Sequence, residues 1–323
     1  MIDLEFRLEL ESYLRLNHAS HREWQSALRI LYGSSDIRCD FPASDGCAGA
    51  LSALDSEAGQ IVWLHASQDM DISGWHREPL VAVIATAGEA EVAWQGQPWS
   101  GLEAPVAAYH LSGFRLHLAG DSEVVFVRPN PDLLPHLPEP AGALPAELKT
   151  LVENYLFRAR MFINDQQART LTTDVLKVFN RALVTGQVTG SPVVTPTEFD
   201  RRLVRVIEKI RTEPEWDFDL HELASHAGVS ERNLYYLMKR QTGMTPYRYF
   251  QRCRLLRVRQ QLVDCQCPLP HISWYAINEG FSHLGRFSAL YREHFGELPS
   301  ETVGWRRRLL SSDPEVNAAD PVS

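Results

Sequence analysis

The first 128 residues combine one helical pattern with a series of short strands. Apolar positions spaced three and four apart predict a helix over residues 3–32, which Gly33 ends. From about residue 49 to residue 128 short apolar runs alternate with glycines, and this pattern predicts a small antiparallel barrel or sandwich. The expected strands are Ile61–Ala66, Leu80–Thr86, Glu91–Gln95, Val106–Tyr109, Phe114–Leu118 and Glu123–Val127.

Helical spacing dominates the rest of the chain. Six prolines between Pro129 and Pro145 exclude a regular element from that stretch. Rows of apolar residues then predict two helices, over about 146–163 and 166–183. Residues 186–198 are rich in Gly, Thr and Pro, which is typical of a linker. The segments from there to about residue 310 are helical, and a polar tail follows.

Basic residues are concentrated in the C-terminal third. The chain has 323 residues and a formal net charge of −9. Residues 1–200 carry 14 Lys and Arg against 26 Asp and Glu, whereas residues 201–310 carry 18 against 12. Because only one segment has a basic balance, only that segment is expected to meet phosphates.

Composition predicts a cytoplasmic protein with free thiols. The N-terminus lacks a secretory pattern, and the longest apolar run, residues 79–87, is too short to cross a bilayer. The odd number of cysteines and their scatter fit neither a disulfide framework nor a zinc site, since even the neighbouring Cys265 and Cys267 lack such spacing. The five cysteines are Cys39, Cys47, Cys253, Cys265 and Cys267.

Residues 220–246 are repeated in residues 272–299. In each copy a small alanine lets two helices cross closely, and a glycine permits the left-handed conformation of a tight turn. A serine that suits a helix N-cap follows, so each copy predicts a helix-turn-helix unit. The equivalent pairs are Leu220 and Ile272, Ala224 and Ala276, Gly228 and Gly280, Val229 and Phe281, Ser230 and Ser282, and, after one inserted residue, Leu234 and Phe287, Leu237 and Leu290, Met238 and Tyr291, Gly243 and Gly296, and Pro246 and Pro299.

The helix between the two units is expected to act as a strut. It covers about Thr245 to Val263, and at about 1.5 Å per residue it spans roughly 28 Å. That length approaches the ~34 Å turn of B-DNA, so the strut can hold two reading helices in successive major grooves. Its pattern places Phe250, Leu255, Val258 and Leu262 inside and projects four arginines outward, namely Arg252, Arg254, Arg257 and Arg259.

The second unit contains a specific run of residues: Gly280-Phe281-Ser282-His283-Leu284-Gly285-Arg286-Phe287, then Tyr291-Arg292, Phe295-Gly296 and Pro299-Ser300. Through this run, residues 203–306 resemble the DNA-binding domain of the AraC/XylS family of transcription regulators. The most specific match is to the family's second helix-turn-helix signature. The N-terminal two-thirds resemble the family's cupin-like regulatory domain with its dimerisation helices, but only in the order of their elements.

The resemblance implies an α+β chain of two domains. Residues 1–185 would form a cupin-like regulatory and dimerisation domain, with its barrel over about 49–128 and its dimerisation helices over about 146–183. Residues 199–310 would form an all-α, homeodomain-like domain with two helix-turn-helix units. The linker, residues 186–198, would join them, and residues 311–323 would be a disordered tail.

The outward positions of the two reading helices are the predicted DNA contacts. Arg232 suits the O6 and N7 atoms of guanine, and tyrosines can pack on a thymine methyl group. Serines and Lys239 suit phosphates. In the second helix Gly285 and Ala289 leave fewer groups for direct base reading, which favours recognition of DNA shape. The predicted contacts are Ser230, Arg232, Tyr235, Tyr236, Lys239, Ser282, His283, Arg286, Ser288 and Arg292.

A basic run, Arg306 to Arg308, follows the last apolar row. It is either a solvated helix end or a further set of phosphate contacts. The sequence pattern alone favours neither alternative.

The strand region could hold a small-molecule pocket, although each aromatic or basic side chain there could equally be an ordinary core or surface residue. Strand alternation puts Trp63 and His65 on one face of a strand, and Arg115 and His117 on one face of another. Metal-binding cupins place two histidines one residue apart, and that pattern is absent, so no metal or cofactor is expected. The candidate ligand residues are Trp63, His65, Trp75, Trp94, Tyr109, Arg115 and His117.

Three functions remain open at this point. The first is a ligand-responsive, homodimeric activator that binds promoter DNA and recruits RNA polymerase, as the resemblance implies. The second is a regulator controlled by a protein partner instead of a small molecule. The third is a metal-dependent cupin enzyme fused to a DNA-binding module, which the missing metal and catalytic motifs disfavour.

Overall fold

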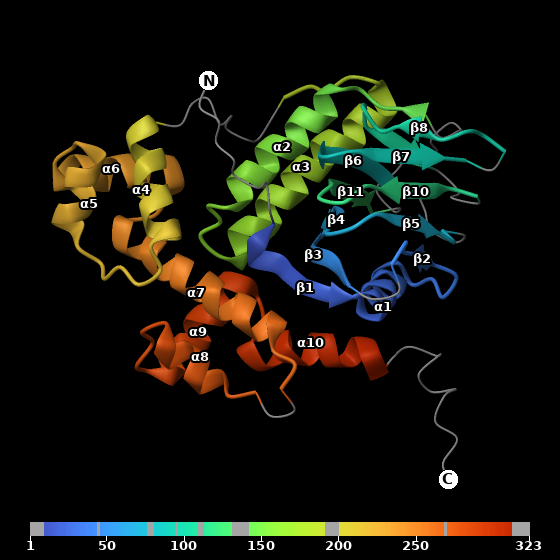
Figure 1. Ribbon diagram of the computed structural model, residues 1–323. Helices are drawn as coiled ribbons and strands as arrows, with labels where there is room; N and C mark the ends of the chain where they lie inside the picture. The colour runs from blue at the N-terminus through green and yellow to red at the C-terminus, as the bar shows by residue number, and fades with distance from the viewer. Residues whose placement is uncertain are drawn as a thin grey trace, which may run out of the picture.

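A strand-rich N-terminal part and a helical C-terminal part pack side by side (Figure 1). The computed structural model describes residues 10–43, 46–75, 81–94, 96–108, 113–130, 142–190, 200–267 and 270–311. The chain is therefore α+β, as the sequence pattern predicts. Among the described residues, no helix is both long and apolar enough to span a bilayer.

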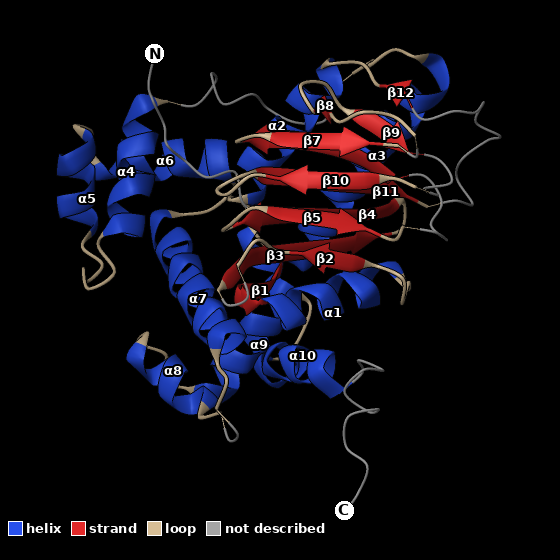
Figure 2. Cartoon of the chain, turned by 45° about the vertical axis from the view of Figure 1, so that its right-hand side comes forward, coloured by secondary structure: helices blue, strands red, loops and turns tan. Residues whose placement is uncertain are grey.

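Two antiparallel sheets form the N-terminal part (Figure 2). Within the described residues the larger sheet has the order β1-β3-β4-β11-β6-β9-β12, and the smaller has the order β2-β5-β10-β7-β8. The strands are β1 (Leu14–Ser20), β2 (Arg38–Asp40), β3 (Cys47–Ser56), β4 (Gly59–Ala66), β5 (Met70–Ser73), β6 (Val81–Ala87), β7 (Ala90–Ala93), β8 (Ser100–Gly101), β9 (Val106–Ala108), β10 (Arg115–Leu118), β11 (Glu123–Pro129) and β12 (Gly142–Ala143).

Each of the six predicted strands overlaps an observed one. They correspond to β4, β6, β7, β9, β10 and β11, with ends that differ by a few residues. The pattern did not predict β3, because its ten residues include several small and polar side chains that give no clear alternation. The prediction of a sheet-rich N-terminal domain is thus confirmed.

The larger sheet separates two apolar cores. Side chains of β11 alternate between them: Val124 and Phe126 point toward the smaller sheet, whereas Val125 and Val127 point toward two helices on the other face. These helices, α2 (Glu147–Ala159) and α3 (Asp165–Thr185), match the two that were predicted. They lie side by side over the larger sheet, as Figure 1 shows.

The predicted helix over residues 3–32 is wrong over residues 10–20. A short 3-10 turn, Glu11–Tyr13, leads into β1, and only α1 (His21–Tyr32) is helical; residues 3–9 lie outside the described residues. The side chain of Ser20 caps α1 together with Glu23. Strand β1 forms because its backbone pairs with β3, a long-range contact that local spacing cannot reveal.

Seven helices in the described C-terminal residues form the two predicted helix-turn-helix units and their supports. Gly228 (φ 70°) and Gly280 (φ 80°) make the tight turns that the repeat predicts. The helices are α4 (Arg201–Thr212), α5 (Leu220–Ala227), α6 (Glu231–Thr242), α7 (Pro246–Asp264), α8 (Ile272–Asn278), α9 (Leu284–Phe295) and α10 (Pro299–Ser311).

The two parts share apolar cores. Phe157, near the end of α2, and Met161, just after it, are buried in the core of the first helix-turn-helix unit. Leu309 of α10 is buried in the core between the two sheets. The predicted linker falls partly outside the described residues, which resume at residue 200, and the predicted tail lies outside them except for Ser311.

Candidate DNA interface and interdomain cavity

The first reading helix, α6, presents its predicted polar face to solvent. The backbone N–H of Asn233 donates to Ser230 Oγ (3.3 Å), which starts the helix as an N-cap. Buried Leu234, Leu237 and Met238 fix which side faces outward. Local capping and core spacing therefore decide the orientation of this helix.

The predicted contacts on α6 are all exposed. Tyr235 and Tyr236 keep 44% and 57% of their surface in solvent. The Arg232 guanidinium lies 5.7 Å from the centre of the Tyr236 ring, so the aromatic face pre-orients this arginine. The Lys239 ammonium donates to Gly243 O (3.1 Å) at the C-terminal end of the helix.

The second reading helix begins one residue later than its serine implied. Ser282 was expected to be the N-cap, but α9 starts at Leu284 and His283 occupies the cap position without a side-chain hydrogen bond. Ser282 and His283 are therefore free of a capping role. Ser282, His283, Arg286 and Arg292 are exposed, and Ser288 is half-buried.

Two of the four arginines predicted to project from the strut do not reach solvent. Arg252 and Arg259 are each 1% exposed and face the N-terminal part of the chain. Arg252 donates to Phe162 O (2.8 Å) and Ser12 Oγ (2.9 Å), and Arg259 donates to Leu14 O (3.0 Å). These positions lie seven residues apart, so they share one face of α7, which is covered by the other domain.

The other two strut arginines are half-buried in ion pairs. Arg257 Nε lies 2.7 Å from Glu279 Oε2, and Arg254 Nη2 lies 3.7 Å from Asp217 Oδ1. Arg306 is buried as well, whereas Arg307 and Arg308 are exposed. The strut is therefore a scaffold helix, and its arginines join elements of the protein together.

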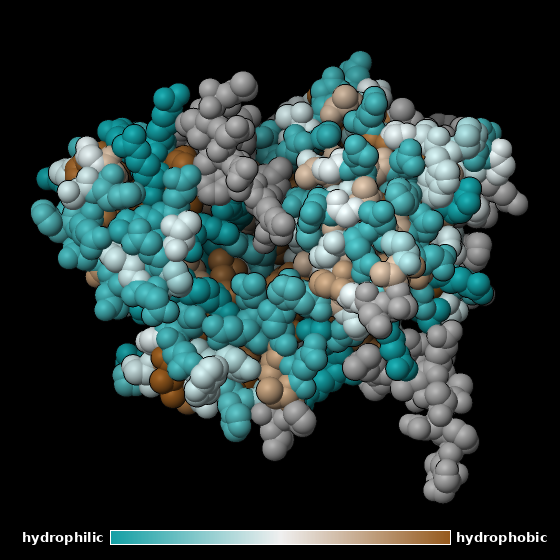
Figure 3. Space-filling view, in the orientation of Figure 1, coloured by the Kyte–Doolittle hydropathy of each residue, from teal (hydrophilic) through white to brown (hydrophobic). Residues whose placement is uncertain are grey.

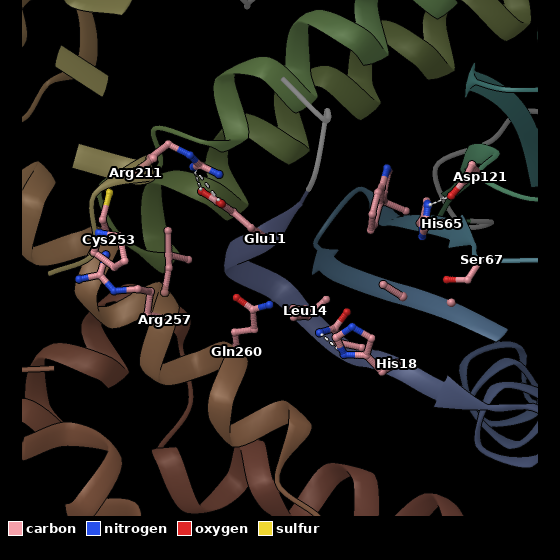
Figure 4. A pocket seen from close by; sticks show the side chains of 16 residues that line it. Glu11, Leu14, His18, His65, Ser67, Asp121, Arg211, Cys253, Arg257 and Gln260 are labelled. Carbon is pink, nitrogen blue, oxygen red and sulfur yellow. Dashed lines mark hydrogen bonds and ion pairs between the residues drawn. The ribbon is translucent and has the colours of Figure 1, made fainter. Parts of the chain in front are cut away.

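A cavity of about 680 Å³ lies between the two parts of the chain. Figure 3 shows the surface hollowed between the helical part and the sheet part. Figure 4 shows His65, Ser67 and Asp121 on the sheet side of the cavity, opposite Arg257 and Gln260 of α7 on the far side. The walls thus come from both domains.

Trp63 and His65 are the predicted ligand residues that this cavity brings together. They line it from β4, with ring centroids 6.2 Å apart and planes inclined by 13°. His65 Nε2 lies 3.6 Å from Asp121 Oδ1. Glu11 also lines the cavity; although burial opposes its ionisation, Arg211 and Arg252 hold the pKa of its carboxyl below the usual value.

The remaining predicted ligand residues lie elsewhere. Trp75 and Trp94 pack around Phe114 in the core between the sheets. Arg115 and His117 are on the outer face of β10, because the alternate residues of this strand, Leu116 and Leu118, are the buried ones. Arg115 stacks on Trp99 at 4.8 Å, and His117 Nδ1 is 2.7 Å from Asp71 Oδ1. Tyr109 lies outside the described residues.

The seven candidates therefore do not form one pocket inside the sheets. Sequence reasoning also missed the cavity walls contributed by the strut, such as Leu256 and Gln260. A local pattern carries no signal for them, because they face the cavity only when the two domains dock.

Comparison with known proteins places the C-terminal region in a defined class. Residues 223–305 match the family described as a helix-turn-helix domain. The XylDLEGF operon transcriptional activator 1 of Pseudomonas putida is 37% identical over 111 residues, 34% of this chain and 33% of that protein. The HTH-type transcriptional activator RhaS of Escherichia coli O157:H7 is 34% identical over 89 residues, 28% of this chain and 30% of that protein.

A solved structure covers the same region. A probable AraC family transcriptional regulator from Rhodopseudomonas palustris is 30% identical, covers 32% of this chain and 96% of its own, and has a TM-score of 0.31. The chain spans about a third of the length of the curated relatives it matches. The matched region is a helix-turn-helix domain, and this C-terminal part of the chain belongs with the regulators of the AraC/XylS family.

Proposed function

We propose that this chain is a sequence-specific transcription regulator that binds promoter DNA through both helix-turn-helix units. The observation that carries the proposal is the repeated unit with an exposed reading face. Arg232 on α6 and Arg286 on α9 are both exposed, and neither pairs with a carboxylate within the described residues. The 19-residue strut joins the two units over roughly 28 Å, close to one turn of DNA.

Selection from random DNA duplexes tests this proposal directly. The full chain should enrich a shared sequence, and binding to it should weaken steeply as salt rises, because cations on the protein replace counterions on phosphates. A variant with both Arg232→Ala and Arg286→Ala should lose the preference but keep its fold. Enrichment of no sequence, with binding that does not depend on salt, would argue against DNA as the target.

We further propose that a small-molecule effector occupies the interdomain cavity and not the space between the sheets. The cavity supports this because it is lined by Trp63, His65 and polar groups of both domains, so an occupant would bridge them. The space between the sheets is filled by large side chains such as Trp75 and Phe126. An occupant would therefore change how the helix-turn-helix units sit on the regulatory domain.

Thermal-shift screening of small acids, amines and sugars tests this second proposal. A true effector should raise the melting temperature of the native chain but not that of His65→Gln. His117→Gln is the matched control, since this histidine lies on the outer face of the other sheet. A compound that stabilises both variants equally binds elsewhere, and a chain that no compound stabilises favours control by a protein partner.

Activation, polymerase recruitment and dimerisation complete the proposal. The relatives named above are activators, which favours activation here, with RNA polymerase as the partner at the promoter. The cupin-like N-terminal domain would supply the homodimer contact through α2 and α3, whose outer faces lie away from the sheet. Sedimentation of the full chain should reveal a dimer, and a monomer at micromolar concentration would refute this part.

A further inference from the structure

Both reading helices end against the same turn of the regulatory domain. This turn comprises residues 160–164 together with Asp165, the first residue of α3, and joins α2 to α3. A Cβ placed on Gly243, which ends α6, would lie 2.6 Å from Ile163 Cδ1. A Cβ placed on Gly296, which ends α9, would lie 2.6 Å from Asp165 Cγ. The two glycines are equivalent positions of the repeat, so the turn meets each unit at the same point.

The turn also contacts the strut midway between the two units. Arg252 donates to Phe162 O (2.8 Å) and to Ala159 O (3.4 Å). One turn earlier on α2, Arg158 donates to Gln241 O (2.6 Å) at the end of α6. The α2–α3 connection therefore contacts the first unit, the strut and the second unit.

The turn is itself held firmly by the regulatory domain. The Tyr13 hydroxyl and Arg169 Nε both donate to the Asp165 carboxylate at 2.8 Å. The backbone N–H of Ile163 donates to Gln167 Oε1 (2.8 Å), and the Phe162 ring is buried in the core beneath the larger sheet. Because this turn is rigid and contacts both helix-turn-helix units, it can fix their relative orientation.

We propose that Ile163 and Asp165 are positioning residues that set the relative orientation of the two reading helices and thereby select the spacing between the two DNA segments they contact. The inference rests on the proposed function, since it requires both helices to read one duplex. Inserting one base pair between the segments moves them apart by about 3.4 Å and rotates them by roughly 34°. Two helix-turn-helix units held at a fixed relative orientation should bind such a lengthened duplex more weakly. Units released from the turn can change their relative orientation and should lose less affinity.

Three alanine variants test the inference in the full chain. Gly243→Ala and Gly296→Ala place a methyl group where the turn lies. Gly186→Ala is the matched control, because Gly186 ends α3 with a similar φ of 69° but has nothing within 4 Å of its Cβ position. Backbone strain is therefore the same in all three, and only the first two disturb the contact with the turn.

The measurement is the ratio of affinities for the selected duplex and for duplexes with one base pair inserted or removed between the two segments. Misfolding lowers the active fraction but leaves this ratio unchanged, so a purely structural role would not move it. We expect the ratio to fall about fivefold in Gly243→Ala and Gly296→Ala, the size of coupling between groups in contact, and to stay unchanged in Gly186→Ala. Ratios equal to that of the control would overturn the inference.

A second pair of variants keeps the test decisive if the glycine variants fail to fold. Ile163→Ala and Asp165→Ala remove the contact from the side of the turn without backbone strain and should lower the same ratio. Native spacing preference in both would overturn the inference. A native chain that binds no duplex refutes the proposed function instead, and a native chain that binds all spacings equally refutes only the positioning role.

Discussion

Arg306, on the last helix, and Glu23, on the first, form a two-pronged ion pair that joins the two domains. Arg306 Nε lies 2.5 Å from Glu23 Oε1, and Arg306 Nη2 lies 2.8 Å from Glu23 Oε2. Both side chains are more than nine-tenths buried. The basic run at 306–308 left open a solvated helix end or a phosphate contact, and for Arg306 the structure shows neither. Arg306 instead pairs with a carboxylate in the interior of the protein.

Replacing Arg306 should weaken the fold without altering recognition of phosphates. Arg306→Gln leaves the Glu23 carboxylate buried without its counter-charge, which typically costs about 3 kcal/mol of unfolding free energy. Denaturant titration measures the loss, and Arg308→Gln, at an exposed neighbour, should change it by less than about 0.5 kcal/mol. The salt dependence of DNA binding should match that of the native chain; a shallower slope would restore Arg306 as a phosphate contact.

Arg232 should read one base. Arg232→Ala should cost about 1–3 kcal/mol of binding at a single position of the selected duplex and relax the preference there, because a bidentate contact to a base edge is lost. Lys239→Ala, near the C-terminal end of the same helix, should weaken binding by a similar factor on every sequence. Measuring both variants against all four bases at each position decides the assignment: uniform losses for Arg232→Ala would make it a phosphate contact.

Acid should weaken the link between β1 and the second unit. Although burial opposes ionisation, Arg259 and Arg15 lower the pKa of Glu297 to about 2 from its ordinary value of 4.5. The folded carboxyl thus has the lower pKa, so its contribution is complete above about pH 4.5 and is lost as pH falls toward 2. This contribution is about 3 kcal/mol.

The variant Glu297→Gln isolates that contribution. Its unfolding free energy should be lower than that of the native chain at pH 6, and the difference should shrink as both are acidified to about pH 2. Chemical unfolding at a series of pH values measures this. A difference that stays constant over the acidic range would mean that Glu297 is not ionised in the folded protein.

The DNA-binding region alone should bind DNA but fold less stably. A fragment of residues 198–323 keeps both reading helices, yet it lacks Phe157 and Met161 from the core of its first unit and the partners of Arg252. We expect salt-dependent but weaker DNA binding and a lower melting temperature than that of the same region in the full chain. A fragment that binds DNA as tightly and melts as high would show that the shared core contributes little.

Much of the helical domain is predictable because its signals are local. The glycines of both tight turns, the Ser230 cap and the apolar spacing of α6 act within a few residues of each other, so the repeat reports them directly. The positions of the candidate ligand residues were not predictable in this way. Trp63 and Trp75 are both tryptophans in the strand region, and the sequence gives no reason to separate them. In the structure they lie on opposite sides of the larger sheet, and of these two only Trp63 lines the cavity.

The sequence by itself determined the two reading units, their spacing along the strut and which side of α6 faces outward, since helix periodicity and capping are properties of neighbouring residues. Only the tertiary structure decided that Arg252, Arg259 and Arg306 are buried, that β1 is a strand, and that a cavity opens between the domains. Burial depends on which surfaces dock, and an arginine has the same local pattern whether it meets water, phosphate or a carboxylate from the far end of the chain.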